Sequence, residues 1–266
     1  DRVIHKRGRV SSETREKIEA ILESAGYRPN PLARHLKRAR PYRIGVLMPA
    51  LEDESCYWRQ VYEGLLSAKE ELAAFSFDID LFEFSRDNDD TIQQSFSRMK
   101  DAQCDARIVA PVRQTLMREL LSTDTSDSPL ICIDSPLPGA SPNLTIAQDP
   151  WQGGLLAARL MRLVASCDGP FATVRPYTGA FNLDERVRGF REAGAVGQKE
   201  PNTTDGLDTV CSSLEDSSIE ALVEGLFERE RNLKGVFVVS SIGHLIAKQV
   251  QLRGRLPDVR VIAWDL

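Results

Sequence analysis

The sequence VSSETREKIEAILESAGYRPNPLARHLKRARPYR, residues 10–43, decides how this chain is organised. It predicts a capped helix, a stop, a second short helix and a basic tether. Only nine residues precede it, and a long alternation of strand-like and helix-like segments follows it. A short basic helical segment is therefore joined to a body of a different kind.

The first helix of this stretch carries both start and end signals. Ser11 or Ser12 supplies an N-cap, and Glu13 in the first turn complements the helix dipole. Gly26 occupies the usual C′ position, and Pro29 prevents the helix from continuing. The apolar positions, spaced i, i+3, i+4 and i+7 on one face, are Ile18, Ile21, Leu22 and Ala25.

A second helix is predicted to begin at Asn30-Pro31, an Asn N-cap followed by Pro at the first helical position. It runs from Leu32 to about Arg38. A helix this short does not persist alone in water, so we expect it to become ordered only when it docks on a partner.

The charge of the chain is unevenly distributed. The net charge of -5 combines +7 for residues 1–43, with 12 Lys/Arg against 5 Asp/Glu, and -12 for the remainder, with 22 against 34. One interpretation is a solvated helix followed by a charged linker. The interpretation that we favour is a nucleic-acid contact at the basic end.

Several classes of protein find no support in the sequence. No run approaches the roughly 18 apolar residues of a membrane-spanning helix, and the start DRVIHKRGRV has no apolar core of signal-peptide length, so we expect a cytoplasmic protein. Five dispersed cysteines and three distant histidines lead us to expect reduced thiols, no metal site and no cofactor. No nucleophile-elbow, P-loop, dinucleotide or zincin motif occurs, so we expect no enzymatic activity.

From residue 42 onward the pattern is α/β. Strand-like runs rich in Val, Ile and Leu alternate with helical segments, which predicts parallel sheets covered on both faces. The runs are residues 43–48, 77–84, 107–110, 130–133, 144–147, 171–174, 236–239 and 259–263, and the helices are about 56–74, 89–101, 113–121, 152–165, 185–193, 217–230 and 243–253. Eight such strands could form one sheet or two lobes.

Three motifs carry a resemblance to the LacI/GalR family of bacterial transcriptional regulators. They are V-S-x-x-T-R-x-K-I at residues 10–18, A-G-Y-x-P-N at 25–30 and L-A-R-x-L at 32–36. The resemblance implies that residues 1–43 hold the second half of a helix-turn-helix headpiece and a complete hinge helix, so we expect this fragment not to read an operator through the major groove. The DNA-contacting residues that it implies are Arg2, His5, Tyr27, Asn30, Leu32, Ala33, Arg34 and Leu36, of which Leu36 is the wedge that enters between base steps.

The same resemblance favours two lobes for the α/β body. It implies a periplasmic-binding-protein-like sensor of two Rossmann-like lobes around a ligand cleft, with the first lobe at residues 44–147 and the second at 148–266. In the family the chain returns to the first lobe after a strand ending in G-[FY]-D. Here that strand is residues 261–265, so we expect the return strands and last helices to lie outside this sequence.

The ligand site is expected where parallel strands end, because their loops carry the polar groups. Aromatic rings, carboxylates, amides and an arginine suit a polyhydroxylated ligand. The resemblance singles out the Arg of R-x-x-G-F and the Asp after the last strand. The expected ligand-binding residues are Tyr57, Trp58, Pro111, Asp134, Asp149, Asn182, Arg186, Ser240 and Asp265.

Each of these assignments has an alternative. Arg186 and Asp265 could be an ion pair that holds one lobe together, and Asp134 and Asp149 could be helix N-caps. The two aromatic residues could belong to the interior. The family commonly has Asn-Asp where this chain has Ser240-Ser241, so a relative's ligand cannot be transferred to it.

The resemblance therefore implies a ligand-responsive, DNA-binding regulator of the repressor type. In its full-length form it would bind operator DNA as a homodimer and would respond to a small-molecule effector, a carbohydrate or related metabolite. It would not associate with a membrane. The alternative is a solute-binding protein with no DNA role. The basic segment at residues 31–40 and the absence of a leader favour the regulator.

Overall fold

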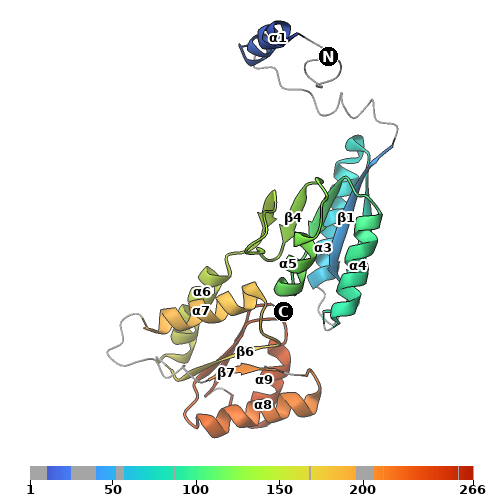
Figure 1. Ribbon diagram of the computed structural model, residues 1–266. Coiled ribbons are helices and arrows are strands. Elements are labelled where there is room, and N and C mark those ends of the chain that lie inside the picture. Colours follow the sequence, from blue (N-terminus) through green and yellow to red (C-terminus); the bar gives the residue numbers. More distant parts are fainter. Residues whose placement is uncertain are drawn as a thin grey trace.

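The computed structural model describes residues 11–24, 40–51, 57–86, 88–167, 169–195, 207–211, 213–256 and 258–265. Within these ranges, nine strands form two separate sheets whose neighbouring strands are all parallel. Helices connect successive strands except β4 and β5, and each sheet with its helices forms one lobe (Figure 1). The α/β, two-lobed fold class predicted from the sequence is confirmed.

The first lobe is built on a sheet with the order β2-β1-β3-β4-β5. Val46, Leu47 and Met48 of β1 have no exposed surface, because this central strand is covered on both faces. The strands are β1 (Tyr42–Pro49), β2 (Phe77–Phe84), β3 (Ala106–Val109), β4 (Leu130–Ile133) and β5 (Leu144–Ile146), and the helices are α3 (Tyr57–Glu71), η1 (Ala73–Phe75), α4 (Asp89–Asp101) and α5 (Gln114–Ser122).

The second lobe is built on a sheet with the order β7-β6-β8-β9. All four residues of β8 are buried, as expected for an inner strand of a parallel sheet. The strands are β6 (Phe171–Arg175), β7 (Asp208–Val210), β8 (Gly235–Val238) and β9 (Arg260–Ala263), and the helices are α6 (Pro150–Ala165), α7 (Phe181–Ala195), α8 (Asp216–Arg229) and α9 (Gly243–Leu252).

Helices α6 and α7 cross so closely that glycine is required at the contact. A Cβ added to Gly154 would lie 2.1 Å from the Arg186 carbonyl oxygen, and one added to Gly189 would lie 2.1 Å from the Trp151 carbonyl oxygen. Real Cβ atoms do not come this close to backbone oxygens, so neither position accepts a side chain without moving a helix. The crossing fixes the backbone that carries Arg186.

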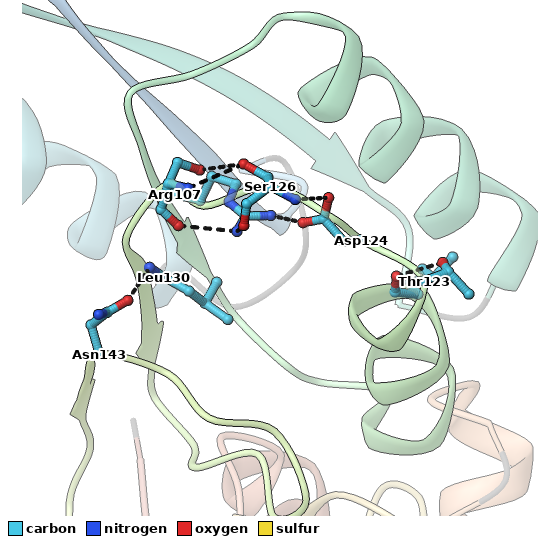
Figure 2. Close-up of polar contacts among 8 residues, drawn as sticks. Arg107, Thr123, Asp124, Ser126, Leu130 and Asn143 are labelled. Atoms are coloured by element: carbon cyan, nitrogen blue, oxygen red, sulfur yellow. Dashed lines mark hydrogen bonds and ion pairs between the residues drawn. The ribbon is translucent and has the colours of Figure 1, made fainter.

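A buried ion pair ties the amino-terminal end of β3 to the loop after α5. The side chains of Arg107 and Asp124 are only 8% and 3% exposed, and they contact each other directly (Figure 2). Arg107 Nη2 also donates to the Ser128 carbonyl oxygen at 3.1 Å. Burial lowers the pKa of Arg107, because water no longer stabilises its charge.

Most element boundaries differ from the sequence prediction by one or two residues, and three differences affect the description of the second lobe. Strand β7 was not predicted, because its three residues, Asp-Thr-Val, do not form an apolar run. Helix α6 begins two residues early, at Pro150, because Asp149 caps it and Pro occupies the first turn. Helix α7 begins four residues early, at Phe181.

The first helix, α1 (Ser12–Ser24), matches its prediction, with Ser11 in the capping role. The Ser11 hydroxyl accepts the Thr14 backbone N–H at 3.3 Å. The predicted hinge helix at 32–38 and the stop at Gly26 lie outside the described residues. In the described ranges, no helix has both the length and the apolar character needed to cross a membrane.

Candidate ligand-binding site

Residues from both lobes line one pocket at the carboxyl ends of the strands. The pocket holds about 670 Å³ of empty space, open solvent included. The expected ligand-binding residues that line it are Tyr57, Trp58, Asp134, Asn182, Arg186, Ser240 and Asp265. The structure thus brings together seven side chains from sequence positions more than 200 residues apart.

Two expected residues do not line this pocket. Pro111 is buried beside it, and its neighbour Val112 contributes to the wall instead. Asp149 is exposed and caps α6, where its Oδ1 accepts the Gln152 backbone N–H at 3.0 Å. The capping alternative therefore describes Asp149, because its carboxylate is turned to a helix N-terminus.

Asp134, directly after β4, joins the two lobes. Tyr57 Oη donates to its Oδ1 at 2.9 Å, and Asn182 Nδ2, from the second lobe, donates to its Oδ2 at 3.0 Å. Burial raises the pKa of Asp134, and the Tyr57 hydrogen bond and the Arg186 charge oppose that rise. Burial and the adjacent Asp134 charge also raise the pKa of Tyr57, which stays a hydrogen-bond donor.

Arg186 is buried in the wall of the pocket and is only partly satisfied. Its Nη1 donates to the Val239 carbonyl oxygen at 3.0 Å, and its guanidinium carbon lies 4.3 Å from the centre of the Trp264 ring. Its Nε has no hydrogen-bond partner among the described residues. Burial lowers the pKa of Arg186, and the charges of Asp265 and Asp134 oppose this effect.

Asp265, which is half-buried, and Ser240 add two further polar groups to the wall of the pocket. Burial raises the pKa of the Asp265 carboxyl, an effect that the Arg186 charge opposes. Within the described ranges no ion pair joins Asp265 to Arg186, and the buried Ser240 hydroxyl has no hydrogen-bond partner. Unpaired buried polar groups are costly, so a ligand that pairs with them gains their hydrogen bonds.

Trp264 and Gln148 are pocket residues that the sequence analysis did not select. Trp264 Nε1 donates to Gln148 Oε1 at 3.1 Å, and the ring fills the space beside Gly153, where an added Cβ would lie 2.3 Å from it. Trp264 comes directly after β9 and Gln148 comes two residues after β5, and this position after a strand is the signal that could have identified them. Tyr177 and Arg86, also in the lining, carry the same signal, since each lies two residues after the end of a strand.

The expected DNA-contacting residues cannot be placed in the same way. All eight of them, Arg2, His5, Tyr27, Asn30, Leu32, Ala33, Arg34 and Leu36, lie outside the described residues. In the part of the chain that is described, no group of three or more His, Cys, Asp or Glu side chains could hold a metal ion.

Comparison with known families agrees with this architecture. Residues 44–266 match the family model described as "Periplasmic binding protein domain", which defines the class of the two lobes. Residues 1–30 match the model described as "Bacterial regulatory proteins, lacI family". The chain belongs to the periplasmic binding protein domain family, and its first 30 residues match the lacI family of bacterial regulators, which is the resemblance that its motifs predicted.

Two curated relatives match parts of the chain. The sucrose operon repressor of Streptococcus mutans is 25% identical over 162 residues, which is 60% of this chain and 47% of that protein. Catabolite control protein A of Staphylococcus xylosus is 34% identical over 64 residues, 24% of this chain and 19% of that protein. The matches therefore span about half, or less, of the length of these relatives.

Solved structures share the fold at low sequence identity. The lac repressor dimer bound to operator and the anti-inducer ONPF is 17% identical, with a TM-score of 0.65 over 98% of this chain and 76% of that chain. GanP, a glucose-galactose binding protein from Geobacillus stearothermophilus, is 19% identical, with a TM-score of 0.68 over 84% of this chain and 78% of that chain. At such identities the likeness concerns the fold alone.

Proposed function

We propose that this chain is the sensor, with part of the DNA-binding headpiece, of a ligand-responsive transcriptional regulator of the repressor type. The observation that carries the proposal is the combination of a lacI-type match at residues 1–30 and a two-lobed binding domain at 44–266 on one chain. A pocket between the lobes gives this regulator a place to sense an effector. Its role is binding without catalysis, in the cytoplasm, where the chromosome is.

The proposed effector is a small polyhydroxylated metabolite, such as a carbohydrate. Four aromatic side chains in the lining offer flat surfaces for the C–H faces of a sugar ring: Tyr57, Trp58, Tyr177 and Trp264. Arg186 can donate to a hydroxyl, and the Asp265 carboxylate can accept from its neighbour. The absence of an Asn at position 240 is the reason that we name a class of ligand and not one sugar.

The proposed macromolecular partners are operator DNA and a second copy of the chain. The lac repressor, which shares the fold, was solved as a dimer bound to its operator. In a dimer, two hinge segments would meet in the minor groove, and Leu36 would insert between base steps and bend the DNA. The effector would change the orientation of the lobes and thereby the operator affinity.

A second candidate is a solute-binding protein with no DNA role. It is favoured by the likeness of the lobes to sugar-binding proteins such as GanP. The two candidates differ in what residues 1–43 do, because a solute receptor does not need a basic segment with a lacI-type match. About 20 more headpiece residues in the gene upstream of Asp1 would support the regulator, and a leader peptide would contradict it.

The direct test uses the full-length protein. A thermal-shift screen of mono- and disaccharides identifies the effector, since a ligand at 100 times its Kd stabilises the fold by about 2.7 kcal/mol. Fluorescence anisotropy with DNA from the promoter of the protein's own operon then measures affinity with and without that effector. A sugar that binds, without any sequence-specific DNA binding, would favour the solute-binding protein.

A further inference from the structure

Asp134 occupies a strained position at the boundary between the lobes. Its φ of +68° lies in the left-handed region, which costs a residue other than glycine of the order of 1 kcal/mol or more. Such a conformation persists only where surrounding contacts impose it. The Asp134 backbone N–H donates to the Ile146 carbonyl oxygen at 3.0 Å, and its carboxylate accepts one hydrogen bond from Tyr57, in the same lobe, and one from Asn182, in the other.

The Asn182 amide is held in place for this contact. Its Oδ1 accepts the Leu183 backbone N–H at 3.0 Å, which leaves Nδ2 to point at Asp134. Asn182 lies in the first turn of α7, and α7 is locked to α6 by the glycine crossing described above. The amide therefore moves with the second lobe.

The polar groups of the pocket fall into two sets. Both Asp134 oxygens already accept hydrogen bonds from protein donors. Two buried pocket atoms have no hydrogen-bond partner among the described residues, the Ser240 hydroxyl and Arg186 Nε, and both belong to the second lobe. A ligand thus finds open partners in the second lobe, while Asp134 is already engaged.

We propose that the Asp134–Asn182 hydrogen bond is a latch that holds the two lobes closed over the pocket. Asp134 is then a latch residue, and the main ligand acceptor is Asp265. Without the latch the lobes swing apart and expose Trp58 and Trp264 to water. The latch itself does not depend on the proposed function. Its regulatory consequence, a preset resting angle between the lobes, does rest on the proposed function.

The test exchanges the two side chains. Asn182→Asp places two carboxylates against each other and should open the cleft. Adding Asp134→Asn restores the bond with donor and acceptor reversed, since the amide at 134 donates to the carboxylate at 182 and its oxygen still accepts from Tyr57. Asn tolerates the left-handed backbone, so the exchange adds no strain. Tyr57→Phe is the matched control, because it removes a bond to the same carboxylate within one lobe.

Small-angle X-ray scattering on the whole chain at pH 8 measures the opening, and tryptophan emission supports it. We expect a larger radius of gyration and red-shifted emission for Asn182→Asp, wild-type values for the double variant, and a wild-type radius for Tyr57→Phe. An unchanged radius in Asn182→Asp, or a double variant that stays open, overturns the latch. Circular dichroism checks that each variant is folded. If Asn182→Asp unfolds, Asn182→Leu is used in its place, and its cleft must also open.

A separate measurement tests the regulatory consequence. In the full-length protein, Asn182→Asp should change operator affinity by about 5- to 150-fold, the usual range of coupling between sites. An open cleft with unchanged operator affinity overturns the regulatory role and leaves the latch standing. If the wild type binds no operator while the scattering results hold, the proposed function fails and the latch does not.

Discussion

Removing the carboxylate of Asp124 should destabilise the first lobe strongly, although this residue lies far from the pocket. Asp124→Asn keeps the shape of the side chain and leaves Arg107 as a buried cation without its counter-charge. The Arg107 side chain is 8% exposed and cannot turn to water without leaving its backbone carbonyl partners. Breaking a buried pair in this way costs about 3–5 kcal/mol.

That loss is large compared with the roughly 5–15 kcal/mol that stabilises most domains. For a body of this size, 1 kcal/mol shifts Tm by about 2–4 °C, so the expected decrease in Tm is about 6–20 °C. Differential scanning calorimetry, with urea unfolding followed by circular dichroism, measures both quantities. The transition of the first lobe should move, and ligand binding to the folded protein should not.

The matched control is Asp78→Asn in the same lobe. Asp78 pairs with Lys69 at 3.0 Å, but these side chains are 53% and 41% exposed. Exposed pairs contribute about 0–1 kcal/mol, so the control should change Tm by only a few degrees. If Asp124→Asn cost no more than Asp78→Asn, the argument from burial would be wrong.

Three further changes have defined outcomes. Gly154→Ala forces a Cβ onto the Arg186 carbonyl and should lower the free energy of unfolding, measured in urea, by about 1–3 kcal/mol. Its control is Gly225→Ala in α8, where an added Cβ meets nothing within 4 Å and stability should be unchanged or higher. Equal effects of the two changes would contradict the close helix crossing. Arg186→Ala should abolish the effector response and leave operator binding intact, and a normal calorimetric titration of the effector would remove Arg186 from the site. The third concerns pH dependence. The pKa of Asp134 in the folded state is raised above its ordinary value of about 3.9, so the folded state binds this proton more tightly than the unfolded state does. The stability that this group contributes is therefore full below about pH 4 and is lost as the pH rises through the folded-state pKa. Asp134→Asn should therefore flatten the decline of unfolding free energy with rising pH, and a steeper decline would refute the sign.

Much of the site followed from a single rule, that parallel strands bring their carboxyl ends to one edge of the sheet. The rule selected Asp134 and Asp149 on equal grounds, since each is an Asp that follows a strand. The structure separates them through the backbone: the left-handed conformation of Asp134 places its carboxylate between the lobes, while the extended backbone of Asp149 turns its carboxylate to a helix N-terminus. The residues next to each Asp in the sequence do not predict which of the two backbone conformations it adopts.

Long-range pairing was equally hidden from the sequence. Asn182 was chosen for its place before the R-x-x-G-F segment, but its partner Asp134 is 48 residues away. Trp264 was read only as part of a strand-end motif, although its ring contacts Arg186 and fills the space left by Gly153. Both contacts depend on how the lobes and helices pack, which periodicity and capping signals do not report.

The order of the strands along the chain has a consequence for biosynthesis. The first sheet uses residues 42–146 and the second uses residues 171–263, without any exchange of strands between them in the described chain. Because domains fold as units, and the N-terminal one first as the chain leaves the ribosome, the first sheet can assemble while the second is still being translated. The pocket is complete only once Asp265 has emerged, so an effector cannot assist folding before that point.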